Sequence, residues 1–136
     1  MAAISVGVLG ACLELAVKFA NERILYGKPI AKLQAIQFDV AETRVEYEAA
    51  RLLLYRAASM KDAGIPCANE FSIAKYYASE AACRAAKRIM DMMGGYGVIN
   101  EYPIGRYLRD AQAIIPAGGT THIQKMIIGA NTLAGK

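Results

Sequence analysis

One long helical repeat, between residues 33 and 62, constrains the fold of this chain more than any other feature of its sequence. Apolar or small side chains recur there in alternating steps of four and three residues, at Ile36, Val40, Thr43, Tyr47, Ala50, Leu54 and Ala57. This spacing lines up one face of an α-helix, which can pack against neighbouring helices over its whole length. Such a helix predicts a helical bundle.

Other stretches have the same period and are separated by Gly or Pro. We expect helices over about 2–26, 68–92 and 104–112, and a last helix that opens after Thr120-Thr121. The first and last helices are expected to bury Leu9, Leu13, Val17, Ala20 and Ile24, and Ile123, Met126, Ile127, Ala130 and Leu133, respectively.

Turn and capping residues set the expected helix ends. Gly27 and Pro29 are expected to stop the first helix, and Thr121 and Gln124 have the spacing of a capping box. No segment alternates with period two between turn signals, so we expect no β-sheet. The prediction is an all-α fold, an antiparallel up-and-down four-helix bundle with a short extra helix, in a single domain over residues 1–136.

Composition excludes several classes of protein. A chain that is 55% hydrophobic and 21% charged is not disordered, and a net charge of +4 without runs of like charge argues against nucleic-acid binding. Glu14 and Lys18 interrupt the apolar N-terminus, which favours a buried helix over a membrane span. Cys12, Cys67 and Cys83 lack metal-binding spacing and are interpreted as free thiols of an intracellular protein, with no metal site.

The stretch 114-IIPAGGTTHIQ-124 resembles a loop that runs into a helix N-terminus, a place that can hold a phosphate or an oxyanion. The loop nevertheless has no Glu, Asp, Cys or Ser for acid–base or nucleophilic work. Either it has lost a catalytic residue or it never carried one. A bare helical interaction module would not explain this loop or the glycines of 94-GGYG-97, and a metal-carboxylate bundle would need Glu-x-x-His pairs that the sequence lacks.

Four stretches together resemble the C-terminal domain of the flavin-dependent acyl-CoA dehydrogenases. They are 23-RILYGKPIAKLQAIQFDVAE-42, 47-YEAARLLLYRAA-58, 94-GGYGVINEYPIGRYLRDA-111 and 119-GTTHIQKMIIGA-130. The resemblance implies a helical bundle, in agreement with the periodicity. It also implies that this chain is a fragment or a single-domain protein, because complete members add an N-terminal helical domain and a middle β domain.

By this resemblance the cofactor is FAD, and Arg23 meets the pyrophosphate of an FAD held mainly by a neighbouring subunit, since a guanidinium suits two phosphate charges. Tyr26 and Gln34 would border the adenosine end, and Gly94 and Gly95 would let the backbone approach the cofactor. Purely structural roles stay open: Arg23 can close a helix against its dipole, Gln34 can be a solvated polar residue at a helix start, and the glycines can form a helix C-cap.

Three further positions differ in how well they match the family. Thr120 matches a threonine that contacts FAD, a role compatible with capping a helix. Asp91 stands where members usually have Gln; a carboxylate near pyrophosphate would be repelled, and it could instead accept a hydrogen bond from ribose or pair with an Arg. His122 stands where members often have Glu or Gln, and it is either a phosphate donor or a solvated side chain.

The resemblance locates the family's usual catalytic Glu at Gly118, so no catalytic side chain is expected in this chain. Members with a small residue here have their Glu on the first bundle helix, about one turn upstream of Met1. Gly118 and Gly119 would then contact the substrate, and the Gly118 backbone N–H would polarise the thioester. A non-catalytic relative or an inactive partner subunit is the alternative.

The implied partners are an acyl-CoA substrate, further copies of the chain in a dimer or tetramer, and electron-transferring flavoprotein. The implied location is the cytoplasm, or the mitochondrial matrix in a eukaryote. We expect the isolated chain to assemble without turning over substrate, because it lacks the middle domain that encloses the flavin ring.

Overall fold

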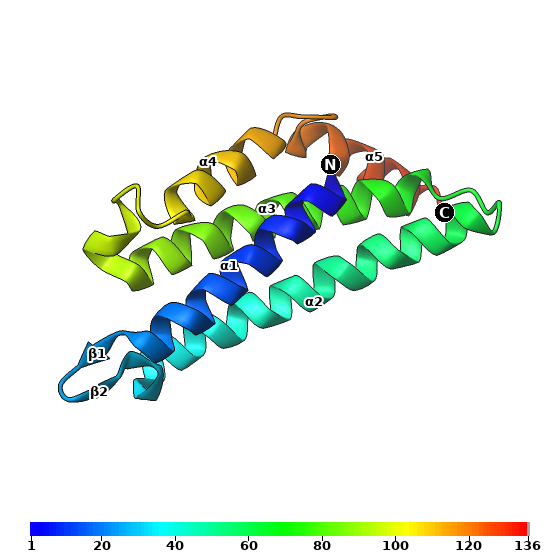
Figure 1. The fold of residues 1–136 in the computed structure, drawn as a ribbon. Coiled ribbons are helices and arrows are strands. Elements are labelled where there is room, and N and C mark those ends of the chain that lie inside the picture. Colours follow the sequence, from blue (N-terminus) through cyan, green and yellow to red (C-terminus); the bar gives the residue numbers. More distant parts are fainter. Residues whose placement is uncertain (136) are drawn as a thin grey trace.

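The computed structural model describes residues 1–135 and consists almost entirely of helices that run up and down (Figure 1). The five α-helices are α1 (Ala2–Glu22), α2 (Gln34–Asp62), α3 (Ala68–Met93), α4 (Ile104–Ile114) and α5 (Thr121–Leu133). A 3₁₀ turn, η2 (Gly94–Gly97), follows α3 directly. The all-α bundle predicted from the periodicity is confirmed.

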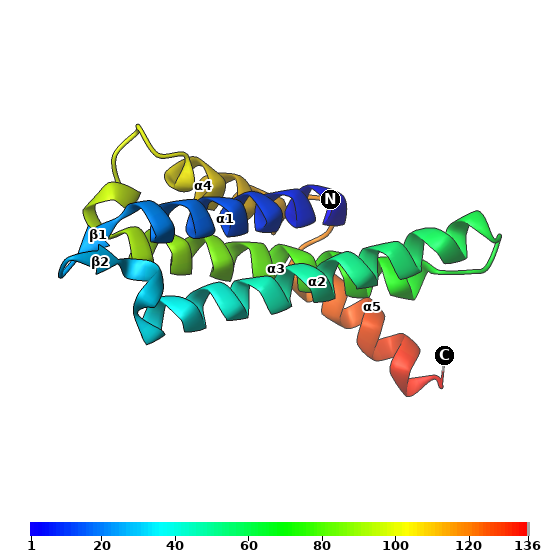
Figure 2. The same ribbon diagram turned by 60° about the horizontal axis from the view of Figure 1, so that its bottom comes forward.

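The two C-terminal helices differ in how they join the bundle. The short helix α4 packs against α3 and α1, and so adds a fourth helix to the bundle of the three long helices. Helix α5 packs on α3 and then leaves the bundle, as Figure 2 shows. The predicted apolar face of α5 is therefore largely uncovered in the single chain, with Ile123, Met126 and Leu133 exposed.

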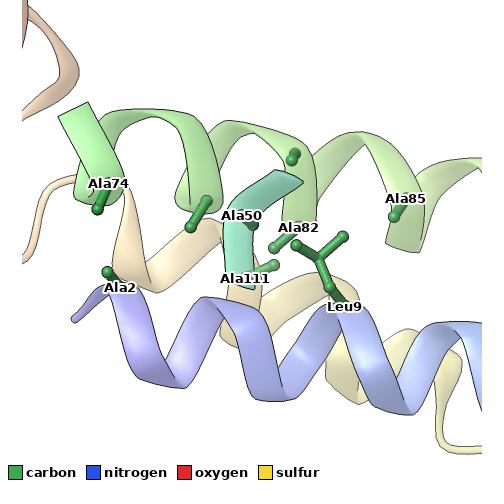
Figure 3. Packing of buried hydrophobic residues seen from close by; sticks show 9 residues of the cluster. Ala2, Leu9, Ala50, Ala74, Ala82, Ala85 and Ala111 are labelled. Atoms are coloured by element: carbon green, nitrogen blue, oxygen red, sulfur yellow. The ribbon is translucent and has the colours of Figure 1, made fainter. Parts of the chain in front are cut away.

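Small side chains allow the long helices to approach closely. Helix α3 contributes a stripe of fully buried alanines, including Ala74, Ala78, Ala82 and Ala85. Leu9 of α1 and Ala50 of α2 point into this stripe (Figure 3). A second cluster at the other end of the bundle holds the larger side chains Phe19, Ile30, Ile89, Met93 and Ile104. Because alanine side chains are small, neighbouring helices can pack closely against α3. This explains why the helix richest in alanine lies at the centre of the bundle.

The seam predicted on α2 is confirmed, because Thr43, Ala50 and Ala57 are buried and the other predicted seam residues, Ile36, Val40, Tyr47 and Leu54, are half-buried. A polar network lies beside this seam and joins α2 to α3. The Arg88 guanidinium donates to Glu46 Oε2 at 2.9 Å and to Thr43 Oγ1 at 3.1 Å, and Arg84 Nε donates to Glu46 Oε1 at 2.8 Å. Glu46 is thus held by two cations from the neighbouring helix.

The expected end of the first helix, and the expected absence of any sheet, are wrong in detail. Helix α1 ends at Glu22, and a small antiparallel hairpin follows, with β1 (Ile24–Leu25) paired to β2 (Lys28–Pro29) before the 3₁₀ turn η1 (Ile30–Lys32). Tyr26 and Gly27 form its turn with φ angles of 52° and 76°. Both central residues of such a two-residue turn need positive φ. Because Tyr rarely adopts positive φ, the sequence contained no clear hairpin signal.

The hairpin changes which residues of the first segment are buried. Val17 and Ile24, predicted to face the core, are exposed, while Cys12, Ala16 and Phe19 belong to the buried stripe that starts at Ala2. By length and hydropathy α1 could cross a membrane. In this fold it is a core helix with one face buried against α3.

The predicted capping box at the start of α5 is also wrong. Thr120, one residue earlier, is the N-cap, and its hydroxyl accepts a hydrogen bond from the Ile123 N–H at 3.4 Å. Thr121 Oγ1 donates instead to Glu80 Oε1 at 2.6 Å. The Gln124 amide is turned back toward the preceding loop, where it meets backbone carbonyls.

Candidate functional site

The predicted site residues fall into two groups at opposite ends of the bundle. Arg23 follows the C-terminus of α1, and Gly94 follows the C-terminus of α3, near the hairpin (Figure 1). Gly118 lies in the loop before α5, beside Met1. Since α1 has 21 residues at about 1.5 Å each, roughly 30 Å separates the two ends. One small ligand cannot touch both groups within one copy of the chain.

At the hairpin end, Arg23 lies with Gly94 and Gly95 in the lining of one cavity of about 320 Å³. The Arg23 guanidinium carbon is 5.0 Å from the centre of the Tyr96 ring, and the Arg23 Nη1 atom donates to the Tyr96 hydroxyl at 3.4 Å. Tyr96 packs in turn against Phe19 at 5.7 Å between ring centres. The aromatic rings therefore hold the guanidinium at the mouth of this cavity.

The other residues predicted at this end lie outside that cavity. Tyr26 is 85% exposed at the tip of the hairpin. Gln34 is the exposed first residue of α2. Asp91 is exposed and pairs with Lys87 one turn earlier on α3, rather than with an arginine. The structure thus brings Arg23 and the two glycines together, and leaves these three side chains at the periphery.

At the loop end, Gly118 contributes to a cavity of about 350 Å³ with Met1, Ser72, Lys75 and Gln124 in its lining. A Cβ atom added to Gly118 would lie 3.1 Å from Met1 Cγ. Met1 and Gly118, the loop position at which the resemblance places the usual catalytic Glu, therefore lie beside each other in the lining of this cavity. Among the residues that the structure describes, no Asp or Glu lines this cavity.

Two buried polar side chains under the loop were missed from the sequence. Lys75 Nζ donates to the carbonyl oxygens of Ile115 at 2.7 Å and Gly119 at 2.8 Å. Gln124 Nε2 donates to the carbonyls of Gly118 and Gly119 at 3.2 and 3.3 Å. The available signal was a lysine directly beside the buried alanines of α3, where the helical period predicts no solvent.

Thr120 and His122 face a different cavity, of about 360 Å³, whose lining includes Glu80 and Cys83. Burial and the nearby Glu80 carboxylate raise the pKa of the Cys83 thiol, so this sulfur stays protonated near neutral pH and is a poor nucleophile. Glu80 accepts the Thr121 hydroxyl hydrogen bond, and His122 is exposed. The Cys83 thiol donates to the Gln112 amide oxygen at 3.8 Å rather than to Glu80 or His122.

Together, these features define a class: an all-α bundle domain with a cationic, glycine-lined cavity at one end and a glycine loop over a buried lysine at the other. Residues 1–133 match the profile of the family described as "Acyl-CoA dehydrogenase, C-terminal domain". The chain belongs to the acyl-CoA dehydrogenase family, as its C-terminal domain.

Individual relatives agree with this assignment. The chain is 42% identical over 135 residues to an acyl-CoA dehydrogenase of Bacillus subtilis, covering 99% of this chain and 36% of that protein. The structure of butyryl-CoA dehydrogenase from Megasphaera elsdenii superposes with a TM-score of 0.95 at 39% identity, over 97% of this chain and 34% of that one. The chain therefore spans about a third of the length of these relatives.

A more distant solved structure was determined with a cofactor. It is described as the FAD complex of PigA, and it matches 99% of this chain and 35% of its own with a TM-score of 0.93 at 27% identity. The helical arrangement is thus retained in a protein whose structure contains FAD.

Proposed function

We propose that this domain belongs to a working acyl-CoA dehydrogenase, which removes hydrogen from Cα and Cβ of an acyl-CoA thioester. The reaction needs a general base for the α-proton, donors that polarise the thioester carbonyl, and FAD, which when bound accepts the hydride. The observation that carries the proposal is the contact between Met1 and Gly118, because it joins the start of α1 to the loop that has no catalytic side chain.

The base in this proposal is a Glu on the first bundle helix, about one turn before Met1 in the protein that carries this domain. A helix advances about 5.4 Å per turn. Because Met1 itself contacts Gly118, a side chain one turn earlier would reach the same end of the cavity. Gly118 and Gly119 would contribute backbone N–H groups to the thioester oxygen, a role that needs no side chain.

The residues at the hairpin end fit the phosphates of FAD. A guanidinium pairs well with two phosphate charges, and a Cβ added to Gly94 or Gly95 would meet nothing within 4 Å, so the backbone there is open to a ligand. Since Arg23 is roughly 30 Å from Thr120 by the length of α1, we propose that Arg23 serves the FAD of a neighbouring copy. Thr120 and His122 would then contact the cofactor of their own copy.

Three peripheral side chains have weaker assignments in the same proposal. Tyr26 and Gln34 flank the adenosine end from the hairpin and the start of α2. Asp91 would accept a hydrogen bond from a ribose hydroxyl, provided that Lys87, its partner here, balances the charge. The exposed positions of all three leave them free to meet a neighbouring copy.

The proposal includes the partners of the whole protein. These are an acyl-CoA substrate, further copies in a dimer or tetramer, and electron-transferring flavoprotein as electron acceptor. The setting is the cytoplasm or the mitochondrial matrix. Exposed apolar side chains on α2 and α5, such as Leu52 and Met126, support self-association because burying them would stabilise an assembly.

A second candidate is a non-catalytic FAD- or acyl-CoA-binding relative, or an inactive partner subunit. The observation that favours it is the lack of a carboxylate beside Gly118 among the described residues. The two candidates differ in one measurable respect, since only the first needs a Glu that reaches the cavity from outside this domain.

The test is to purify the protein that carries this domain and measure FAD content and acyl-CoA oxidation with an artificial electron acceptor. The panel contains straight and branched acyl-CoAs of matched length. We expect turnover, with a preference for branched chains because Gly118 leaves room that a larger residue would fill. FAD binding without turnover supports the non-catalytic candidate, and a preference for short straight chains contradicts the inference about Gly118. The isolated chain serves as the control and is expected to be inactive.

A further inference from the structure

Lys75 is a buried cation without a charged partner in the part of the chain described. Lys75 lies on α3 and is 6% exposed, yet the structure places no carboxylate within ion-pairing distance of its ammonium group. Burying an ammonium group without an opposite charge is costly, and most lysines avoid it. Burial lowers the pKa of Lys75, while the charge of Glu80 opposes that effect. A side chain kept at such a cost needs a reason beyond filling space.

Every hydrogen bond of Lys75 goes to the loop before α5. Its Nζ atom holds the carbonyls of Ile115 and Gly119 at 2.7 and 2.8 Å, which are the lengths of strong charge-assisted bonds. Gln124, also 6% exposed, holds the carbonyls of Gly118 and Gly119 from the first turns of α5. Two buried donors from two helices therefore grip the same five-residue segment, 115–119.

These hydrogen bonds also fix the direction of the backbone N–H groups that share a peptide plane with the Gly118 and Gly119 carbonyls. Residues 1–135, as the structure describes them, contain no cis peptide bond, and in a trans peptide the N–H points away from the C=O of the same plane. With the carbonyls of Gly118 and Gly119 turned inward, the N–H groups of Gly119 and Thr120 point away from Lys75 and Gln124. A cation on a carbonyl also polarises its peptide, which makes the attached N–H a stronger donor.

The backbone of the loop is suited to this arrangement only with glycine. Gly118 and Gly119 have φ angles of +67° and +95°. Residues with a side chain rarely adopt such φ angles. The hydrogen bonds from Lys75 and Gln124 to this loop therefore depend on glycine at positions 118 and 119. A Cβ on Gly119 would lie 2.6 Å from Gln124 Nε2 and would push that donor away.

We propose that Lys75 and Gln124 are positioning residues that hold the backbone N–H groups of Gly119 and Thr120 toward the thioester carbonyl of an acyl-CoA. The inference rests on the proposed function and adds to it the side chains that orient the polarising donors. Lys75 itself does not touch the substrate in this proposal. It acts through the loop, and its effect belongs to the transition state, where charge develops on the thioester oxygen.

The experiment compares Lys75→Met, Lys75→Arg and Gln124→Met with Lys18→Met in the complete FAD-loaded protein. Methionine has nearly the length of lysine but donates nothing, and Lys18 is an exposed lysine of α1 to which the structure assigns no hydrogen bond or ion pair. The measurements are kcat and KM with butyryl-CoA, the Kd of the thioether S-butyl-CoA, which has no carbonyl, FAD content from the flavin absorbance, and amide hydrogen exchange over residues 115–121.

We expect Lys75→Met to lower kcat by about tenfold to a hundredfold. KM, the FAD content and the thioether Kd should change by less than about threefold, since none of them depends on polarising a carbonyl. Exchange of the loop amides should become faster. Lys75→Arg should recover part of kcat because it keeps the charge and the donors, Gln124→Met should have a smaller effect in the same direction, and Lys18→Met should behave as the wild type.

The outcomes separate the two inferences. Wild-type protein that oxidises no member of the panel of straight and branched acyl-CoAs and does not bind S-butyl-CoA contradicts the proposed function, and the positioning role of Lys75 and Gln124 falls with it. If the wild type turns over substrate and the folded, FAD-loaded Lys75→Met protein has the same kcat, the positioning role of Lys75 and Gln124 is overturned while the proposed function stands. A thioether Kd that rises in parallel with the loss of kcat also overturns it, because that pattern indicates a collapsed pocket. If Lys75→Met does not fold, Gln124→Met decides by the same criteria.

Discussion

At the scale of single residues, the glycines of this chain have opposite roles. Gly119 needs its positive φ of +95°, and an added Cβ would lie 2.6 Å from Gln124 Nε2, whereas a Cβ on Gly129 within α5 would meet nothing within 4 Å. We expect Gly119→Ala to destabilise the protein by about 1–3 kcal/mol. Gly129→Ala should stabilise it by about 0.5–1 kcal/mol through helix propensity. Urea unfolding of both variants measures the two signs, and equal effects would contradict the strain argued for the loop.

The thiol of Cys12 gives a second residue-scale prediction. Burial raises the pKa of Cys12 to about 12, and the side chain is 0% exposed. The folded pKa lies above the usual value of 9.0, so this thiol contributes stability that is present below about pH 9 and is lost as pH rises from there toward 12. Iodoacetamide at about pH 8.5 should leave Cys12 unmodified in the native protein and modify it in urea. Mass spectrometry measures the extent of modification. Native labelling of Cys12 as fast as that of the half-buried Cys83 would contradict this.

Arg23 supplies a prediction about the cofactor. Replacing it with Met removes the charge proposed to meet the FAD pyrophosphate while keeping a long side chain against Tyr96. In the complete protein we expect the affinity for FAD to fall by about tenfold, which corresponds to one lost charge-assisted contact of about 1.4 kcal/mol. Arg56→Met, an exposed arginine near the far end of α2 with only a 3.8 Å pair to Glu70, is the matched control. FAD content after gel filtration measures both, and equal retention would remove Arg23 from the cofactor site.

The sequence located most of the candidate site residues but not the groups that support them. Arg23 and the glycines could be found because a motif marks them, and Gly118 could be recognised from the missing Glu. The helical period could show that Lys75 is buried but not what it contacts, because its partners are backbone carbonyls some 40 residues later, and no local pattern records a tertiary contact of that kind. Gln124 was assigned to a capping box, since spacing alone cannot tell which backbone group an amide will choose.

At the scale of elements, the α2–α3 pair shows which ion pairs matter. Glu46 is 12% exposed and contacts Arg84 and Arg88 of the neighbouring helix, whereas Glu48 is 33% exposed and pairs only within α2. We expect Glu46→Ala to cost about 2–3 kcal/mol, because it leaves the poorly exposed Arg88 with Glu42, which is itself solvated, as its remaining charged partner. Glu48→Ala should cost no more than about 0.5 kcal/mol. Thermal unfolding distinguishes them, and similar shifts in Tm would show that the network is screened like a surface pair.

Element prediction succeeded where one strong period governs a long segment and failed where conformation is set by a few residues. The seam of α2 and a helix over about 68–92 were both expected, because burial of one face dominates their energetics. The hairpin at residues 24–29 was missed: its two-residue strands are too short to show a period, and Tyr26 occupies a turn position that usually selects Asn or Gly. Ile24 was placed on the core face of the first helix for the same reason, since α1 ends at Glu22 and Ile24 belongs to β1.

At the scale of the whole molecule, the isolated chain leaves apolar surface that a single copy does not cover. Met126 is 64% exposed and Leu133 is 91% exposed on α5, the helix that leaves the bundle (Figure 2). Ile123 lies on the same side of α5. The net charge of the chain is only +4. A helix with one apolar stripe is stable only if that stripe is buried. Under the proposed function, the roughly 30 Å between Arg23 and the Gly118 loop would likewise require a second copy to complete one FAD site.

The prediction at this scale is that Met126→Glu breaks the assembly while leaving each copy folded. A charge in the centre of a buried apolar contact costs several kcal/mol, and a dimer held by about −8 kcal/mol, or a micromolar Kd, would then dissociate at ordinary concentrations. Sedimentation velocity of the complete protein should show the shift to a smaller species, with unchanged far-UV circular dichroism and reduced FAD content. Lys125→Gln, at the adjacent exposed position, is the control and should sediment as the wild type. If Met126→Glu stays assembled, α5 projects into solvent in the assembly as well, and the second copy must meet this one elsewhere, at the exposed apolar side chains of α2 such as Val45 and Leu52.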